Sequence, residues 1–343
     1  MVITAENRIQ APRLAEVVQL AAERARRSRS DNTHRAYKSD WADFEAACAE
    51  FGLPPIPRAG AAAIYLDQLA RRGAKVATLR RRLAAINARL RSRAAEPLSL
   101  RTEPLASVWR GIQREVGAPP RQARALEVDE LPSVVIACGD HFAGLRNRAL
   151  LLIGFAGAFR RSEIAGLHWS ADTSGQAHVE FVPEGLRVLL RRSKTNQTGE
   201  FEEVAICRGG YSATCPVAAL EAWRAAATAD AGAPPSGPVF RRVDRHGRLS
   251  GEELSGEGVS LIIRSAVERE AVRQRASPEE IAARLHRLSG HSLRSGLVTS
   301  AFAAGLCAED VMRQTRHRNV QTLVRYRRHA TAFVQNVSGR VGL

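Results

Sequence analysis

The segment GAPPRQAR at residues 117–124 divides the chain into two parts of different character. It combines proline, glycine and arginine without any apolar periodicity, which is typical of a linker. The residues before it have helical patterns only, whereas short β-prone runs occur after it. A length of 343 residues suits two domains of ordinary size. We therefore predict a first domain at residues 1–118 and a second at residues 119–343.

The first part is expected to be wholly helical. Helices are predicted at residues 11–29, at 30–51 and, after the chain-breaking PPIP at 54–57, at 59–72. The clearest pattern covers residues 75–93, where apolar side chains recur at steps of three and four residues and form one face. The members of that face are Val76, Leu79, Leu83, Ile86 and Leu90.

The second part is expected to be helical around a small sheet. Helices are predicted at 128–139 and 146–159, and then three β-prone runs follow at 178–182, 187–192 and 202–206, with turns between them. Beyond residue 215 the sequence is helical apart from loops at 232–238 and 243–247. The predicted fold class is mostly α, with a helical N-terminal domain and an α-rich second domain that holds a three-stranded antiparallel sheet.

The charge of the chain indicates a polyanionic partner. Lys and Arg number 51 against 35 Asp and Glu, a formal charge of +16, and most of the cations are arginines, which suit phosphate recognition. The helix at 75–93 carries a dense cationic face, which is either merely solvated or binds phosphates. Because we see no matching acids there, we favour DNA binding by Lys75, Arg80, Arg81, Arg82 and Arg89.

Several classes of protein are disfavoured by what the sequence lacks. The five cysteines are odd in number and include no CxxC pair, so we expect reduced thiols and neither disulfides nor a zinc or other metal site. No apolar run is long enough to span a membrane, and the first residues do not resemble a secretory signal. We expect a cytoplasmic protein of the bacterial nucleoid.

Three segments carry residue types that together suit one reaction. They are GAFRRSEIAGLHW at 157–169, GHSLRSG at 290–296 and RHRNVQTLVRYRR at 316–328. Each has an ordinary explanation alone: an i,i+3 surface ion pair, a histidine that caps a helix, and an exposed aromatic. Together they supply arginines to hold a phosphate, a tyrosine nucleophile and a histidine to accept its proton. That combination fits cleavage of a phosphodiester bond.

The three segments resemble the conserved boxes of the tyrosine recombinase, or phage integrase, family. GAFRRSEI is similar to the first-arginine box, GHSLR to the HxxR box and RHRNVQTLVRY to the closing box with its histidine and tyrosine. RRSKTNQTGEFEEV at 191–204 supplies a lysine in the turn where the family carries one. The resemblance implies a catalytic second domain whose site residues are Arg160, Lys194, His291, Arg294, His317 and Tyr326, with Glu163 in support.

The resemblance also implies the mechanism. Tyr326 attacks the scissile phosphate and forms a 3′-phosphotyrosine, while Arg160 and Arg294 hold the phosphorane. His291 accepts a proton, Lys194 protonates the leaving oxygen and His317 adds a phosphate hydrogen bond. Glu163 either orients the site or serves only the structure. Neither a metal nor another cofactor is expected.

The sequence is most similar to the Cre branch of the family. SDNTHRAY at 30–37 and PVFRRVDRHG at 238–247 look Cre-like, which adds Arg35, Arg241 and Arg242 to the expected DNA contacts. Glu257 stands about where Cre has a base-reading arginine, so the target site is expected to differ. The implied partner is double-stranded DNA with an inverted-repeat site, gripped by both domains.

The implied assembly is a homotetramer on DNA and a monomer when free. Phe333, Val334 and Val337 in the last segment make a small apolar face, which we expect to dock on a neighbouring protomer, the alternative being the chain's own second domain. Two other functions stay open: a monomeric type IB topoisomerase, and a DNA-binding protein without catalysis.

Overall fold

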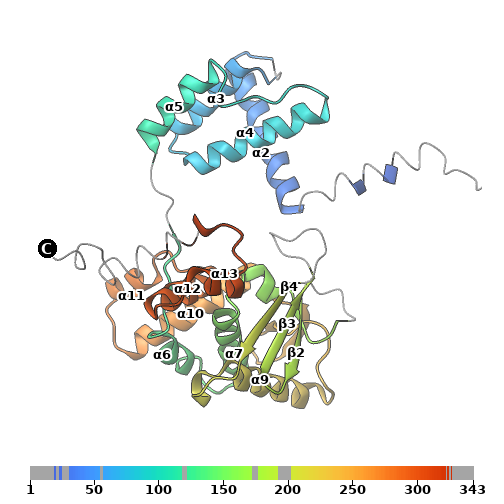
Figure 1. Cartoon of the computed structure of the whole chain (residues 1–343), viewed down its shortest axis with the longest axis vertical. Coiled ribbons are helices and arrows are strands. Elements are labelled where there is room, and N and C mark those ends of the chain that lie inside the picture. Colours follow the sequence, from blue (N-terminus) through green and yellow to red (C-terminus); the bar gives the residue numbers. More distant parts are fainter. Residues whose placement is uncertain are drawn as a thin grey trace, which may run out of the picture. The chain divides into compact units, whose positions relative to one another are not determined.

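The computed structural model describes residues 19–20, 23–24, 31–54, 57–117, 122–171, 177–191, 202–321, 323 and 326. The chain divides into two compact units, residues 1–120 and 121–343. The first unit is helical and the second combines helices with a small sheet, as Figure 1 shows. The predicted fold class is confirmed.

From Asp31 to Gly117, the described part of the first unit is built from four helices. Their apolar faces meet in a core that includes Phe44, Leu66 and Leu105. The sequence patterns predicted the first three helices to within a residue or two, whereas the fourth was not separately predicted. The earlier helix predicted at 11–29 lies mostly outside the described residues. The four helices are α2 Asp31–Glu50, α3 Ala59–Arg71, α4 Val76–Ser92 and α5 Leu105–Val116.

Helix α4 shows why the periodicity was informative. Leu79, Leu83, Ile86 and Leu90 are all buried, as is Ala85, while the other positions between them are exposed or partly buried. One side of the helix is thus fixed against α2 and α3, and its cationic residues are held on the remaining surface.

The second unit has a buried helix at its centre. Helix α7 packs against α9 on one side and α12 on another, so it lies inside the unit (Figure 1). Its buried residues run around the whole helix, which explains the continuous apolar sequence. The helices of this unit are α6 Leu131–Ile136, α7 Phe142–Ala156, α8 Arg161–Ala165, α9 Pro216–Ala231, α10 Gly256–Arg273, α11 Pro278–Leu285, α12 Ser292–Ala303 and α13 Ala308–Thr315, with a 3₁₀ turn at Ser212–Thr214.

The sheet of the second unit contains the three predicted antiparallel strands and one short addition. The strand order is β1-β2-β3-β4, and the two-residue β1 pairs parallel to β2. Val188 lies in the middle strand opposite Val179 and Val204, and all three are buried. The strands are β1 Leu167–His168, β2 Ala177–Val182, β3 Gly185–Leu190 and β4 Glu202–Cys207.

A second, two-stranded hairpin was not predicted. Strands β5 Arg241–Val243 and β6 Leu249–Glu253 flank the charged turn at 243–247, which was expected only as a loop. The sequence of β6 is LSGEE, in which glycine and glutamate are poor strand formers, and its glutamates are exposed. Pairing with β5 overrides this weak local preference.

The segment after the linker anchors helix α12. The backbone N–H of Leu126 donates to the carbonyl oxygen of Ser292 at 3.1 Å, and that of Arg124 donates to Arg287 at 3.0 Å. A Cβ at Gly296 would lie 1.7 Å from the Leu126 carbonyl oxygen, so a side chain there would displace this segment. The close approach fixes the helix that presents the HxxR residues.

None of the five cysteines is paired in a disulfide. Among the described residues, no helix is both long and apolar enough to cross a membrane.

Candidate active site

The chain makes a tight turn between α7 and α8, and Arg160 stands at its end. Ala158 has a left-handed backbone with φ of 47°, which is uncommon for a residue with a side chain. Gly157 lies so close to Phe159 that a Cβ there would be 2.1 Å from its ring. The turn directs the Ala158 carbonyl oxygen toward Arg294, whose Nη1 donates to it at 2.7 Å.

Glu163 gathers two arginines in the interior of the second unit. Its Oε1 accepts from Arg160 Nη1 at 2.7 Å, and its Oε2 accepts from the Arg160 backbone N–H at 2.9 Å and from Arg316 Nη2 at 2.8 Å. Burial alone would raise the pKa of Glu163, but the charges of Arg316 and Arg160 and these hydrogen bonds lower it overall. The carboxylate is therefore ionised and fully engaged.

Arg294 is one of the largest fully buried side chains in the molecule, with 1% of its surface exposed. Burial, followed by the charges of Arg160 and Arg316, lowers the pKa of its guanidinium to about 9. Its charge is still present at neutral pH. Its Nη2 lies 3.4 Å from Nδ1 and 3.3 Å from Nε2 of His317. Two such similar distances place Nη2 over the imidazole face and not in line with either ring nitrogen.

The hydrogen bonds of Thr315 fix the protonation of His317. The Thr315 hydroxyl lies 2.6 Å from the Val311 carbonyl oxygen and 2.6 Å from His317 Nδ1. The carbonyl can only accept, so the single hydroxyl proton points to it and the hydroxyl oxygen accepts from Nδ1–H. Burial, followed by the charges of Arg294, Arg160, His291 and Arg316, lowers the pKa of His317 to about 3. His317 is thus neutral, with its proton on Nδ1 and a lone pair on Nε2.

The tyrosine and its histidine partner come from the same chain. The hydroxyl oxygen of Tyr326 lies 3.4 Å from Nε2 of His291. The Tyr326 ring belongs to a small apolar cluster with Val298, Phe302 and Leu323, and 9% of its surface is exposed. His291 occupies the N-cap position of α12 but makes no side-chain capping bond. The cluster therefore holds the tyrosine beside a histidine that does not cap its helix through its side chain.

The structure brings most of the expected site residues together and adds two. A continuous chain of contacts and charge interactions joins Arg160, Glu163, Arg294, His317, His291 and Tyr326. Lys194 lies outside the described residues, as do residues 329–343 of the expected tail helix. Thr315 and Arg316 were missed, although both directly precede the boxed histidine. Nothing in the sequence marked Thr315. Arg316 lies inside the closing box, but its burial is visible only in the structure.

The cationic residues of α4 are engaged within their own unit. Asp40 is 2% exposed and lies 2.6 Å from Arg81 and 3.0 Å from Arg82. Arg82 is also 3.2 Å from Asp43, and only 18% of its side chain is exposed. The premise that this helix lacks matching acids is therefore wrong for Arg81 and Arg82. Both can still contact DNA only by sharing or leaving these carboxylates.

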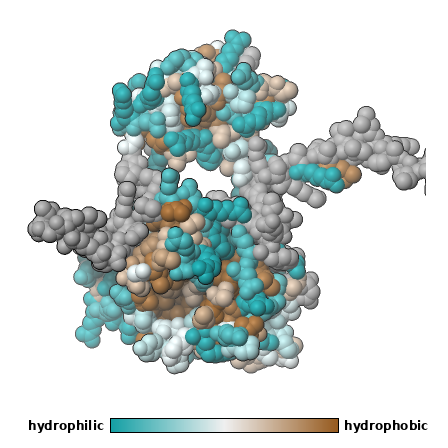
Figure 2. Space-filling view, viewed as in Figure 1, coloured by the Kyte–Doolittle hydropathy of each residue, from teal (hydrophilic) through white to brown (hydrophobic). Residues whose placement is uncertain are grey.

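The remaining expected DNA contacts are more accessible. Arg80 lies over the ring of Trp109, and Arg89 lies over that of Trp41, at 5.7 and 5.5 Å from the ring centres. Hydrophilic side chains cover much of the visible face of this unit in Figure 2. The residues Arg35, Lys75, Arg80, Arg89 and Arg242 are exposed, and Arg241 is half-buried.

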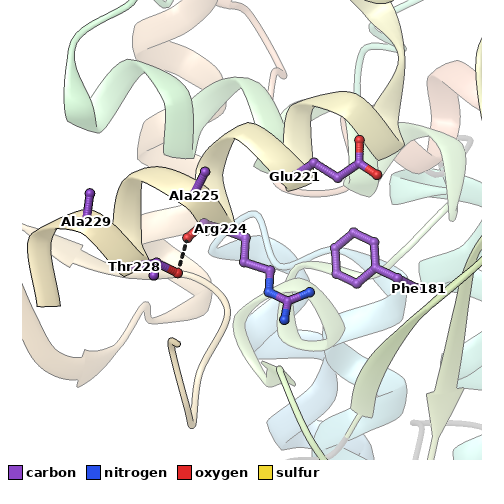
Figure 3. A pocket seen from close by; sticks show the side chains of 6 residues that line it. All are labelled: Phe181, Glu221, Arg224, Ala225, Thr228 and Ala229. Carbon is purple, nitrogen blue, oxygen red and sulfur yellow. Dashed lines mark hydrogen bonds between the residues drawn. The ribbon is translucent and has the colours of Figure 1, made fainter. Parts of the chain in front are cut away.

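The described residues contain no group of three or more His, Cys, Asp and Glu side chains placed to hold a metal ion. A shallow pocket of about 610 Å³ lies on α9 and β2, where Arg224 stacks over Phe181 (Figure 3). None of its lining residues belongs to the arginine, histidine and tyrosine group.

The comparisons with known proteins identify the family of the chain and agree with its fold. The family model described as "Phage integrase family" matches residues 124–332. An "Integrase/recombinase xerD homolog" from Selenomonas ruminantium is 31% identical over 328 residues, which covers 94% of this chain and 88% of that protein. The chain belongs to the phage integrase family of tyrosine recombinases.

Solved structures show the same fold at low sequence identity. The integrase of the Tn1549 transposon, bound to transposon right end DNA, is 16% identical with a TM-score of 0.59 over 95% of this chain and 97% of that one. The XerH site-specific recombinase, bound to a palindromic difH substrate, is 13% identical with a TM-score of 0.59 over 89% and 78%. A lambda integrase dimer bound to a core site is 15% identical with a TM-score of 0.53 over 91% and 76%.

Proposed function

We propose that this chain is a site-specific DNA recombinase that cleaves and rejoins strands through a 3′-phosphotyrosine at Tyr326. The contact between Tyr326 and His291 carries the proposal, because it pairs a nucleophile with a proton acceptor close to the buried Arg294 and the partly buried Arg160. A tyrosine ordinarily has a pKa of about 10, so attack at neutral pH needs such an acceptor. His291 Nε2, at 3.4 Å, can take the phenolic proton with a small movement of either ring.

The arginines stabilise the transition state in this proposal. Arg160 and Arg294 supply forked N–H donors to the non-bridging oxygens of the pentavalent phosphorane, and they are already desolvated and fixed. Glu163 holds Arg160 in place and acts on the phosphate only through it. Lys194 protonates the leaving sugar oxygen, and His317 completes the contacts to the phosphate. Rejoining then needs no further cofactor, because the phosphotyrosine conserves the energy of the broken bond.

The assembly on DNA is also part of the proposal. The XerH substrate is palindromic and the lambda integrase is a dimer on its core site, so related folds act on paired half-sites. We expect this chain to bind inverted repeats and to synapse two sites as a tetramer, with both units on the duplex. Likeness to the Cre branch stays a prediction that rests on the segments SDNTHRAY at 30–37, PVFRRVDRHG at 238–247 and SGHSLRSG at 289–296.

A nicked suicide substrate tests the proposal. Cleavage beside the nick releases a short fragment that cannot rejoin, so the covalent protein–DNA adduct accumulates and is measured on a denaturing gel. Tyr326→Phe is expected to bind DNA as the wild type does and to form no adduct. Tyr211→Phe, at a tyrosine that is 83% exposed, is the matched control and should react normally.

Two outcomes would count against the proposal. Adduct formation by Tyr326→Phe would remove this residue from the role of nucleophile. If the wild type forms the adduct but relaxes supercoils without exchanging DNA between two plasmids of different size, the enzyme is a topoisomerase. Exchange between plasmids that carry the site is the expected result.

A further inference from the structure

Arg316 combines several features that each disfavour an arginine at its position. Its backbone is left-handed, with φ of 58° and ψ of 40°, a conformation that suits glycine. Only 5% of its side chain is exposed, so a full charge is removed from water. Its Nε and Nη1 are buried without a hydrogen-bond partner. A residue with these costs in the centre of a site points to a function for its side chain.

The contacts of the side chain show where that function lies. Arg316 Nη2 donates to Glu163 Oε2 at 2.8 Å, although the two residues are 153 positions apart in the chain. The face of the guanidinium lies over Phe159, 5.2 Å from the ring centre. Arg316 thus contacts residues on both sides of Arg160: it donates to the Glu163 carboxylate and stacks on the Phe159 ring.

We propose that Arg316 is a positioning residue that holds Glu163 and, through it, the Arg160 guanidinium in the geometry that a scissile phosphate requires. Arg316 does not reach the substrate itself, because its free N–H groups are buried and its remaining nitrogen is used on Glu163. Without Arg316, Glu163 would keep Arg160 as its only arginine partner. The Glu163 carboxylate and the Arg160 guanidinium would then be able to move together as a pair, and the guanidinium would no longer be fixed.

This inference rests on the proposed function where it is tested by the rate of adduct formation. Arg316→Gly removes the side chain and suits the left-handed backbone, so the variant is expected to fold. A misplaced catalytic group can slow a reaction about 100-fold, and we expect a loss of that size in the rate of adduct formation on the nicked substrate. Arg316→Lys keeps the charge without the fork and is expected to recover part of the rate. Arg313→Ala, which removes a 79% exposed arginine from the same segment, is the matched control.

A double-mutant cycle separates positioning from a general structural defect. In an Arg160→Ala background, adding Arg316→Gly is expected to change the rate by less than about threefold, because the group that Arg316 positions is already gone. A similar large loss in both backgrounds would show that Arg316 acts by another route. An unchanged rate for Arg316→Gly alone would also overturn the proposal.

A readout without catalysis keeps this inference distinct from the proposed function. Exchange of the Arg160 guanidinium protons with water, followed by NMR, is expected to quicken about tenfold or more in Arg316→Gly and to stay unchanged in Arg313→Ala. If the wild type forms no adduct while Arg160 shows this change, the proposed function fails and the positioning role stands. If Arg160 exchange is equal in the wild type and Arg316→Gly, the positioning role is wrong whatever the activity.

Discussion

Replacement of Thr315 by valine tests the proton arrangement deduced for His317. Valine has nearly the same shape as threonine, but it cannot accept the Nδ1–H that lies 2.6 Å from the hydroxyl. Thr315 is fully buried, so no water is close at hand to replace the lost acceptor. The ring is then free to turn or to move its proton to Nε2, because the partner that fixed it has gone.

The expected cost follows from the burial of the donor. A buried hydrogen bond contributes about 1 kcal/mol net, and a donor left without a partner costs about 1–3 kcal/mol. Because the ring can relax, we expect a loss of about 2 kcal/mol in the stability of the second unit. For a domain of this size that corresponds to a fall of about 4–8 °C in Tm.

Two measurements check this prediction, and Thr315→Ser is the control. The ¹⁵N chemical shifts of His317 should report the Nδ1–H tautomer in the wild type and in Thr315→Ser, because serine keeps the hydroxyl. In Thr315→Val they should show a mixture or the Nε2–H tautomer, with the lower Tm seen by calorimetry. A valine variant that keeps both the Nδ1–H tautomer and the wild-type Tm would refute the assignment.

The remaining predictions concern pH and salt. The pKa of His317 is about 3 in the folded state against an ordinary value of about 6.5, so the unfolded state binds more protons between these values and stability is lost as the pH falls through that window. Allowing for the partial exposure of the ring, we expect the free energy of unfolding of the second unit to fall by about 1–2 kcal/mol from pH 6.5 to pH 4.5. The fall should be smaller in His317→Gln, and equal falls in thermal melts of the two proteins would contradict this. Lys75→Gln with Arg89→Gln should make the plot of log affinity against log salt shallower by about one unit per lost phosphate contact, whereas an unchanged slope would mean a solvated face. Arg82→Gln should instead lower the Tm of the first unit, because Arg82 pairs with buried Asp40.

Local patterns predicted the helices well because the information was local. The buried face of α4 is encoded by side chains three and four positions apart, and its neighbours only had to cover it. The hairpin β5–β6 was missed because its second strand depends on pairing and not on the preferences of LSGEE. The acids opposite Arg81 and Arg82 were missed for a similar reason: Asp40 lies on another helix, 41 residues before Arg81.

The expected site residues, Glu163 included, were predicted through resemblance, whereas Thr315 and Arg316 were not predicted. Arg160, His291, Arg294, His317 and Tyr326 lie in boxes whose order along the chain is distinctive. The supporting roles of Thr315 and Arg316 depend on contacts and backbone geometry that only the folded chain shows. Arg316 meets Glu163 across 153 positions, and the sequence does not show that its backbone is left-handed or that its side chain points inward.

The charges of the site suggest how a bound phosphate would change it. Three buried or half-buried arginines surround one carboxylate, and their mutual repulsion adds to burial in lowering the pKa values of Arg294 and His317. In the proposed mechanism, a phosphodiester held by Arg160 and Arg294 adds negative charge beside these groups, which would raise both pKa values. The neutral Nε2 of His317 could then take up a proton and donate to a phosphate oxygen, which it cannot do while only Nδ1 is protonated. In the proposed mechanism, the hydrogen bond from His317 to the phosphate would therefore form once the DNA is bound.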